Sequence, residues 1–163
     1  WIAQAERRAH GTSSRSPMTQ VDFHFNVPDT GRYGCRLVRK AWQAGHKVVV
    51  YCEDTRRLAS FDRLLWEFAP LSFIPHVSVR HPLAERTPVL LTASDADVPA
   101  SHRQVLVNLG ERMPPAFADY ARVVELVGTD AQSRQAARVR FRSYREQGYT
   151  PLTHDVEERD GNR

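Results

Sequence analysis

The run KVVVYC, residues 47–52, continues without a break in apolar residues after its first lysine. Such a run is typical of a β-strand that is buried on both faces of a sheet. Upstream, VDFHFNV, residues 21–27, alternates in the manner of a first strand. Between the two, residues 33–44 place apolar side chains on one side of a helix that Gly45 closes. This order and spacing predict a βαβ unit with a right-handed crossover.

The rest of the chain continues the alternation of helices and strands. Asp54 or Thr55 caps a predicted second helix over residues 56–68, whose expected buried row is Leu58, Phe61, Leu65 and Phe68. Two prolines open a predicted short helix over residues 114–120. Further strands are predicted at residues 89–92, 104–109 and 123–127. We therefore expect a single-domain, Rossmann-like α/β fold, with an open, mainly parallel sheet flanked by helices.

Composition indicates an ordinary globular protein. Of its 163 residues, 41% are hydrophobic and 26% are charged, and the formal net charge of +4 favours acidic partners. Cys35 and Cys52 lie on different predicted elements outside any CxxC pattern, so we expect reduced core thiols in a cytoplasmic protein. We expect residues 1–17 to be an expression-derived or mis-set start outside the domain, residues 18–152 to form the domain, and residues 153–163 to be a polar tail.

No catalytic, cofactor or metal site is predicted. The first strand-to-helix turn lacks GxGxxG, and no GxxxxGK[ST] or GxSxG motif occurs. Cys52, Glu53 and Asp54 follow a strand, where an enzyme can place a nucleophile or paired carboxylates. Structural roles explain these residues better: Cys52 as a core thiol, Glu53 as a turn residue and Asp54 as a helix cap. The histidines, including His76 and His81 in one loop, lack the close spacing of metal ligands.

The stretch DAQSRQAARVRFRSYREQGY, residues 130–149, predicts a basic helix near the C-terminal end. At roughly 100° per residue, four arginines and one aromatic share one arc, which we call the arginine face: Arg134, Arg138, Phe141, Arg142 and Arg145. Ala136, Val139, Ser143 and Tyr144 are expected to pack on the protein, and Arg140 projects to that same side. Asp130 and Ser133 are possible caps, and Gly148 is a stop signal.

The arginine face is either a solvated surface or a binding surface. No acidic residue lies four positions before any of its arginines, so it lacks intrahelical ion pairs. Arginine suits bidentate capture of carboxylate or phosphate. An exposed Phe141 among guanidinium groups fits a ligand that is both acidic and apolar.

Residues 69–79, APLSFIPHVSV, predict a proline-punctuated loop with Phe73 and Ile74 exposed between Pro70 and Pro75. Trp66 lies off the buried row of the preceding helix. These apolar residues form either a satellite core or an apolar protein-binding patch, and the residues alone leave both open.

Four segments in this order and spacing carry a family resemblance: Trp42 with Gly45, the strand KVVVYCED, the segment LLWEFAPLSFIPH, and the terminal RVRFRSYREQGY. Two blocks within them are fairly specific, W-x6-F-[IV]-P-H at residues 66–76 and R-x-R-aromatic-[KR]-x-Y-R at residues 138–145. Over roughly residues 18–151, the chain resembles the chi subunit of bacterial DNA polymerase III holoenzyme.

The resemblance implies a non-enzymatic replisome adaptor with a Rossmann-like fold and no nucleotide site. Members of the family bind the acidic, Phe-ending C-terminal tail of the single-stranded-DNA-binding protein. They also bind the psi subunit, which tethers them to the clamp loader. Carried over by position, the tail site falls on Val127, Arg134, Arg138, Phe141 and Arg142, and the psi site on Trp66, Phe73 and Pro75.

The sequence leaves two alternatives to this adaptor function. The arginine face is also suited to binding single-stranded nucleic acid directly, although one aromatic is few for a run of stacked bases. An α/β enzyme with a degenerate nucleotide site is the other alternative, and a cofactor would raise its melting temperature.

Overall fold

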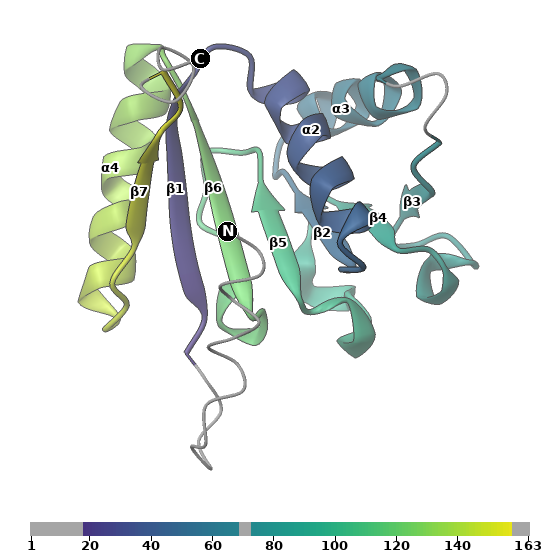
Figure 1. The fold of residues 1–163 in the computed structure, drawn as a ribbon. Helices are drawn as coiled ribbons and strands as arrows, with labels where there is room; N and C mark the ends of the chain where they lie inside the picture. The colour runs from purple at the N-terminus through teal and green to yellow at the C-terminus, as the bar shows by residue number, and fades with distance from the viewer. Residues whose placement is uncertain (1–17, 69–72, 158–163) are drawn as a thin grey trace.

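The computed structural model describes residues 18–68 and 73–157. In these residues the chain forms one seven-stranded sheet in the order β3-β4-β2-β5-β6-β1-β7, and all paired strands are parallel (Figure 1). The strands are β1 (Gln20–Val27), β2 (Val48–Tyr51), β3 (His76–Ser78), β4 (Val89–Thr92), β5 (Val105–Asn108), β6 (Arg122–Gly128) and β7 (Leu152–Asp155). The helices are α2 (Thr30–Gln43), α3 (Thr55–Glu67) and α4 (Ala131–Glu146). The predicted α/β fold class is confirmed.

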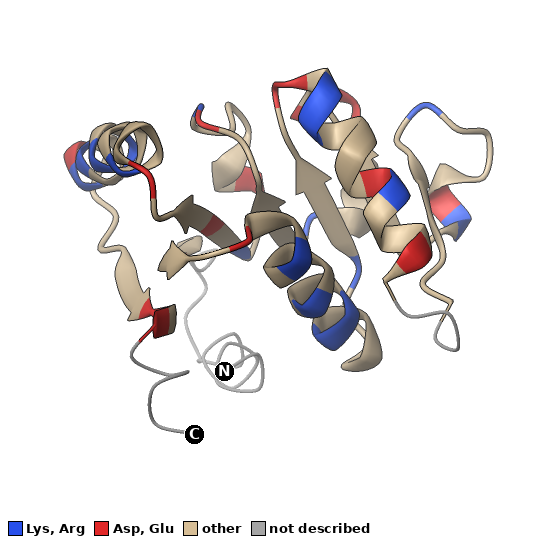
Figure 2. Cartoon of the chain, turned by 90° about the horizontal axis from the view of Figure 1, so that it is seen from above, with Lys and Arg blue, Asp and Glu red and all other residues tan. Residues whose placement is uncertain are grey.

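The sheet separates two hydrophobic cores. Helices α2 and α3 cover one face, and α4 covers the other (Figures 1 and 2). Successive residues of a strand point to opposite faces, so Val48 and Val50 enter the core beneath α2 and α3. Val49 and Tyr51 enter the core beneath α4. This explains why the central strands are apolar at every position.

Local capping sets where two helices begin. The Asp29 side chain accepts a hydrogen bond of 3.1 Å from the backbone N–H of Arg32, so α2 begins at Thr30, three residues before the predicted start. Asp54 caps α3, as one of the two predicted alternatives. The predicted helix over residues 114–120 is wrong, because this segment holds only a single 3-10 turn, Phe117–Asp119.

Two short edge strands were not predicted. β3 pairs only with β4, and β7 pairs only with β1. β7 includes residues 153–155, which the sequence analysis assigned to the polar tail. Each edge strand has a single neighbour and mostly partly exposed side chains, so its sequence lacks the apolar run that identifies the central strands.

A buried polar network fastens α4 to the sheet. Glu125 on β6 is fully buried, and its Oε1 accepts hydrogen bonds from Arg140 Nε at 3.0 Å and Asn108 Nδ2 at 2.8 Å. The Tyr144 hydroxyl donates to Glu125 Oε2 at 2.7 Å, and Arg140 also donates to the Glu111 carbonyl at 2.8 Å. Burial raises the pKa of Glu125, whereas these donors favour the carboxylate. The network therefore supplies partners that a buried carboxylate requires.

This network also determines the rotation of α4. Its buried residues are Ala137, Arg140 and Tyr144, which confirms that Arg140 projects to the packed side. The prediction that Val139 packs against the protein is wrong, because 57% of its surface is exposed. The Arg140 ion pair points that residue at the sheet, and the preceding residue is turned by roughly 100° towards solvent.

We predict that Arg140→Ala lowers the free energy of unfolding by about 3–5 kcal/mol, because it leaves the buried Glu125 carboxylate without its cationic partner. Denaturant unfolding measures the change. Arg145→Ala removes an exposed arginine from the same helix, and its effect should stay within about 0.5 kcal/mol. Equal losses for the two variants would contradict the assigned role of the network.

Candidate functional site

The exposed side of α4 is cationic. Arg134, Arg138, Arg142 and Arg145 are all exposed, as predicted, and none forms an ion pair within residues 18–68 and 73–157. Asp130 caps the helix by accepting the Ser133 N–H at 3.0 Å, and Gly148 beyond the helix has a φ of +92°. The predicted helix and its two ends are confirmed. Four guanidinium groups without an acidic partner among the described residues thus face solvent on one helix.

Beside these arginines lies a cavity of about 430 Å³, between α4 and the strands β1, β6 and β7. Four of the five residues predicted for the tail site line it, namely Val127, Arg134, Arg138 and Phe141. Val127 is buried and contributes to the apolar floor, whereas the two arginines are exposed at the rim. The cavity therefore combines apolar walls with cationic groups.

Arg142 lies outside this cavity, in an adjoining open hollow of about 530 Å³. Arg138 and Phe141 line both spaces, so the two are neighbours, and Arg145 and Glu146 complete the lining of the second. We call the two spaces together the α4 groove. An elongated ligand with an apolar end and several acidic groups matches the shape of this groove.

Phe141 is half-buried, which corrects the expectation of an exposed aromatic. Its ring packs edge-on against Phe23 of β1, with the ring centroids 5.3 Å apart. The exposed part of the ring forms a wall of the α4 groove. Phe141 is therefore held in position before any ligand arrives.

The sequence analysis missed the strand side of the groove, which consists of Phe23, Phe25, Asn26 and Thr153. Asn26 has a φ of 59°, a conformation that asparagine tolerates better than most residues. Its Oδ1 accepts a hydrogen bond of 3.1 Å from Arg134, so β1 helps to orient this arginine. Alternation places Phe23 and Phe25 on one face of the strand, but only the sheet order shows which face α4 covers.

A second candidate surface lies at the opposite edge of the sheet, around β3. Trp66 and Phe73 are 51% and 61% exposed, and their ring centroids are 5.1 Å apart. His76 packs against Trp66 with centroids 4.3 Å apart, and its Nε2 lies 3.0 Å from Asp62. Two exposed rings in tilted contact, those of Trp66 and Phe73, form a surface patch, which we call the Trp66 patch.

Two neighbours of this patch differ in burial. Pro75 is half-buried. Ile74 is 2% exposed and belongs to the core, so the prediction that it is exposed is wrong. The alternation of the chain after Phe73 turns Ile74 inward, and the structure thus brings Trp66 and Phe73 together without Ile74. Pro70 lies outside the described residues.

The carboxyl ends of the central strands are filled by the protein's own side chains. The cavity between the N-terminal ends of α2 and α4 measures only about 10 Å³. Glu53 accepts the Glu111 N–H at 2.9 Å and lies so close to Gly110 that a β-carbon there would be 1.8 Å from its carboxylate. Nucleotides usually bind at this edge of a parallel sheet. Beyond the ends of β5 and β6, the observed packing leaves them no room.

The two cysteines behave as core residues. Both are buried and free, and burial raises the pKa of Cys52 and raises that of Cys35 to about 12. Asp54 is used as the cap of α3. The described residues contain no group of three His, Cys, Asp or Glu side chains that is able to hold a metal ion. Among the same residues, no helix has the length and apolar character needed to cross a membrane.

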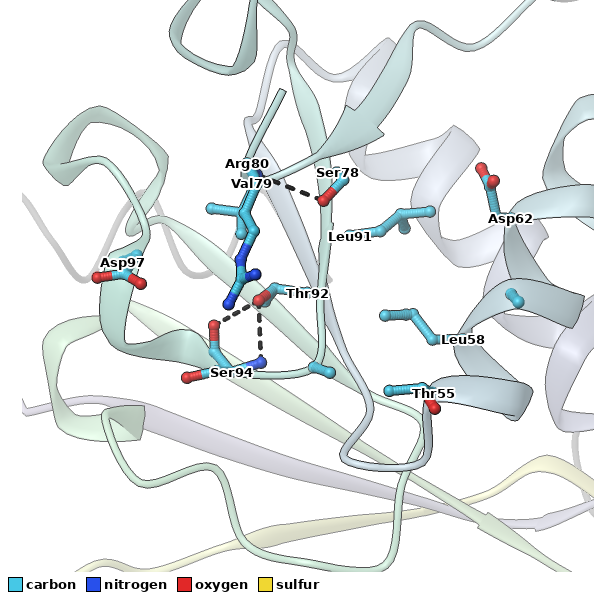
Figure 3. Close-up of a pocket in the computed structure, with 12 residues that line it drawn as sticks. Thr55, Leu58, Asp62, Ser78, Val79, Arg80, Leu91, Thr92, Ser94 and Asp97 are labelled. Atoms are coloured by element: carbon cyan, nitrogen blue, oxygen red, sulfur yellow. Dashed lines mark hydrogen bonds between the residues drawn. The ribbon is translucent and has the colours of Figure 1, made fainter. Parts of the chain in front are cut away.

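A further cavity, of about 450 Å³, lies between α3 and the ends of β3 and β4 (Figure 3). Leu58, Val79 and Leu91 supply apolar walls. Arg80 extends towards the loop after β4 (Figure 3). In this loop the Thr92 hydroxyl donates a hydrogen bond to the Ser94 carbonyl and accepts one from the Ser94 N–H. The polar groups of this loop thus pair with one another and do not converge on the cavity.

Comparison with known proteins identifies the family. Residues 18–152 match the sequence model described as "DNA polymerase III chi subunit, HolC". The chain is 39% identical over 142 residues to the DNA polymerase III subunit chi of Pseudomonas aeruginosa, covering 84% of this chain and 96% of that protein. It is 29% identical over 119 residues to the subunit chi of Escherichia coli, covering 71% and 78%. The chain therefore belongs to the family of the DNA polymerase III chi subunit, a replication accessory subunit.

Proposed function

We propose that this protein is a non-catalytic adaptor whose α4 groove binds the acidic, Phe-ending C-terminal tail of the single-stranded-DNA-binding protein. The observation that carries the proposal is the apolar cavity of about 430 Å³ with Arg134 and Arg138 at its rim. A ligand with an apolar side chain next to a free carboxylate is able to contact both the apolar walls and the arginines of such a cavity. The resemblance of the terminal helix to the chi family supports the same ligand.

The groove suggests how the peptide is held. The terminal Phe ring enters between Phe23, Phe25 and Phe141, and Arg134 and Arg138 pair with the carboxylates next to it. Arg142 and Arg145 in the adjoining hollow meet the preceding aspartates. A buried phenyl ring contributes about 1.5–3 kcal/mol and each exposed ion pair about 0–1 kcal/mol. Several contacts together are thus needed for micromolar binding.

A phosphate ligand fits the groove less well. Phosphates require only cations, whereas the lining of this cavity is chiefly apolar, with three aromatic rings and Val127. Phe141 also packs edge-on against Phe23, with an interplanar angle of 60°, so these two rings do not form a flat stacking surface. The acidic peptide is therefore preferred to direct nucleic-acid binding at this site.

The titration that tests this proposal uses a peptide with several aspartates, a short apolar pair and a free C-terminal Phe. We predict micromolar affinity, a loss of about tenfold or more with Arg138→Ala, and a similar loss with a peptide lacking the Phe. Raised salt should weaken binding. Arg56→Ala, an exposed arginine on α3, is the matched control and should bind normally. Unchanged binding by Arg138→Ala would exclude this groove as the tail site.

We propose that the Trp66 patch binds the psi subunit of the clamp loader. Two aromatic rings that touch each other and are more than half exposed are typical of the centre of a protein interface. Pro75, which follows Phe73 by two residues and is half-buried, is included in the proposed site. The patch lies near β3, at the opposite end of the sheet from α4 (Figure 1), so both partners have room to bind at once.

We predict that Trp66→Ala with Phe73→Ala abolishes copurification with coexpressed psi, because it removes the exposed rings of the patch. The same variant should bind the tail peptide normally. Leu83→Ala, which truncates an apolar residue that is 53% exposed, is the matched control. Retention of psi by the double variant would contradict this assignment.

A further inference from the structure

Helix α2 carries a second cationic surface that neither proposed site uses. Arg32, Arg36 and Lys40 are exposed and follow one another at intervals of four residues. In Figure 2 the basic residues of α2 form bands along the helix with no acidic residue between them. We call these three residues the α2 ridge. It lies across the sheet from α4 (Figure 2).

The charge of this segment is unbalanced. Residues 30–52 contain five of the 23 Lys and Arg residues and none of the 19 Asp and Glu residues. The remaining 18 basic and 19 acidic residues give the rest of the chain a formal charge of −1. No member of the α2 ridge forms an ion pair in the part of the chain that the structure describes. Like charges four residues apart oppose helix formation. The stability of α2 therefore does not explain why three cations occur along it.

The shape of the ridge differs from that of the α4 groove. Its three cations lie along an exposed helix surface and line none of the cavities described above. No apolar cavity is thus available there for the side chain of a peptide. Four residues of α-helix rise about 6 Å, so the three cations are spread along the helix and are able to meet successive phosphates of one strand. The spacing of the cations therefore suits a nucleic-acid backbone better than a Phe-ending peptide.

An aromatic side chain lies beside the ridge. Tyr33 is half-buried, and helical spacing places it on one side of the line of cations. The Arg36 guanidinium carbon lies 5.8 Å from the centroid of the Tyr33 ring. Single-stranded nucleic acid binds to surfaces that combine cations with aromatic rings.

We propose that the α2 ridge binds the phosphate backbone of single-stranded DNA. The proposal is separate from tail binding, because the ridge and the α4 groove lie on opposite faces of the sheet (Figure 2). One protein molecule is then able to hold the acidic tail on α4 and the exposed strand on α2 at the same time.

The test measures binding of a fluorescent oligo(dT) to the full chain by anisotropy, from about 20 to 200 mM salt. Arg32→Gln, Arg36→Gln and Lys40→Gln are combined in one variant. A matched variant replaces three exposed arginines of α3, Arg56, Arg57 and Arg63, and thus has the same net charge. A third variant replaces Arg134, Arg138 and Arg142 on α4. Each variant is also titrated with the acidic peptide.

We predict that the α2 variant loses at least tenfold in affinity for oligo(dT), and that the slope of log affinity against log salt falls by about 2, at about 0.7 for each lost phosphate contact. Its affinity for the peptide stays unchanged, which also shows that it is folded. The α3 variant loses less than threefold, and the α4 variant loses peptide binding alone. The proposal is overturned by absence of oligo(dT) binding at 20 mM salt, by equal losses for the α2 and α3 variants, or by loss only in the α4 variant.

Discussion

The Glu125 carboxylate is buried in the centre of β6, where it receives hydrogen bonds from Arg140 and Tyr144 of the helix that crosses it. Removing this charge from water is costly, and only complete pairing offsets the cost. The pairing is possible at one rotation of α4. At this rotation Ala137 meets the sheet, and Arg138, Arg142 and Arg145 point to solvent. The cationic surface of the protein is thus a consequence of a buried ion pair.

The same rotation builds the apolar half of the α4 groove. It brings Phe141 edge-on to Phe23, so the groove has a fixed wall. Meanwhile, Arg140 and Glu53 fill the edge of the sheet where related architectures bind nucleotides. The fold therefore uses its inner polar residues for rigidity and leaves the proposed binding surfaces on the outside of its helices and near the β3 edge. An adaptor that contacts several partners requires this arrangement of separate surfaces.

Sequence periodicity predicted the central strands and the direction of the arginine face, because burial on both faces and helical spacing leave clear patterns. It predicted the edge strands poorly, since β3 and β7 are short and have one neighbour each. Val139 was placed on the wrong side because the packed side was taken to lie opposite the arginine face, whereas the ion pair of Arg140 turns the helix so that Val139 is exposed. Phe23 and Asn26 were missed because a strand pattern does not specify which face receives a helix. The residues of the Trp66 patch were recognised from their chemistry, which left two interpretations open, and the family resemblance favoured a protein interface.

The central claim is that an acidic, Phe-ending peptide occupies the groove between β1 and α4. Backbone amide NMR spectra of the full chain, recorded during titration with this peptide, test the claim most directly. The account predicts the largest shifts at residues 23–26 and 134–142, with small shifts on α2 and around Trp66. Shifts concentrated on α2 or around Trp66, with none at Phe141, would contradict it.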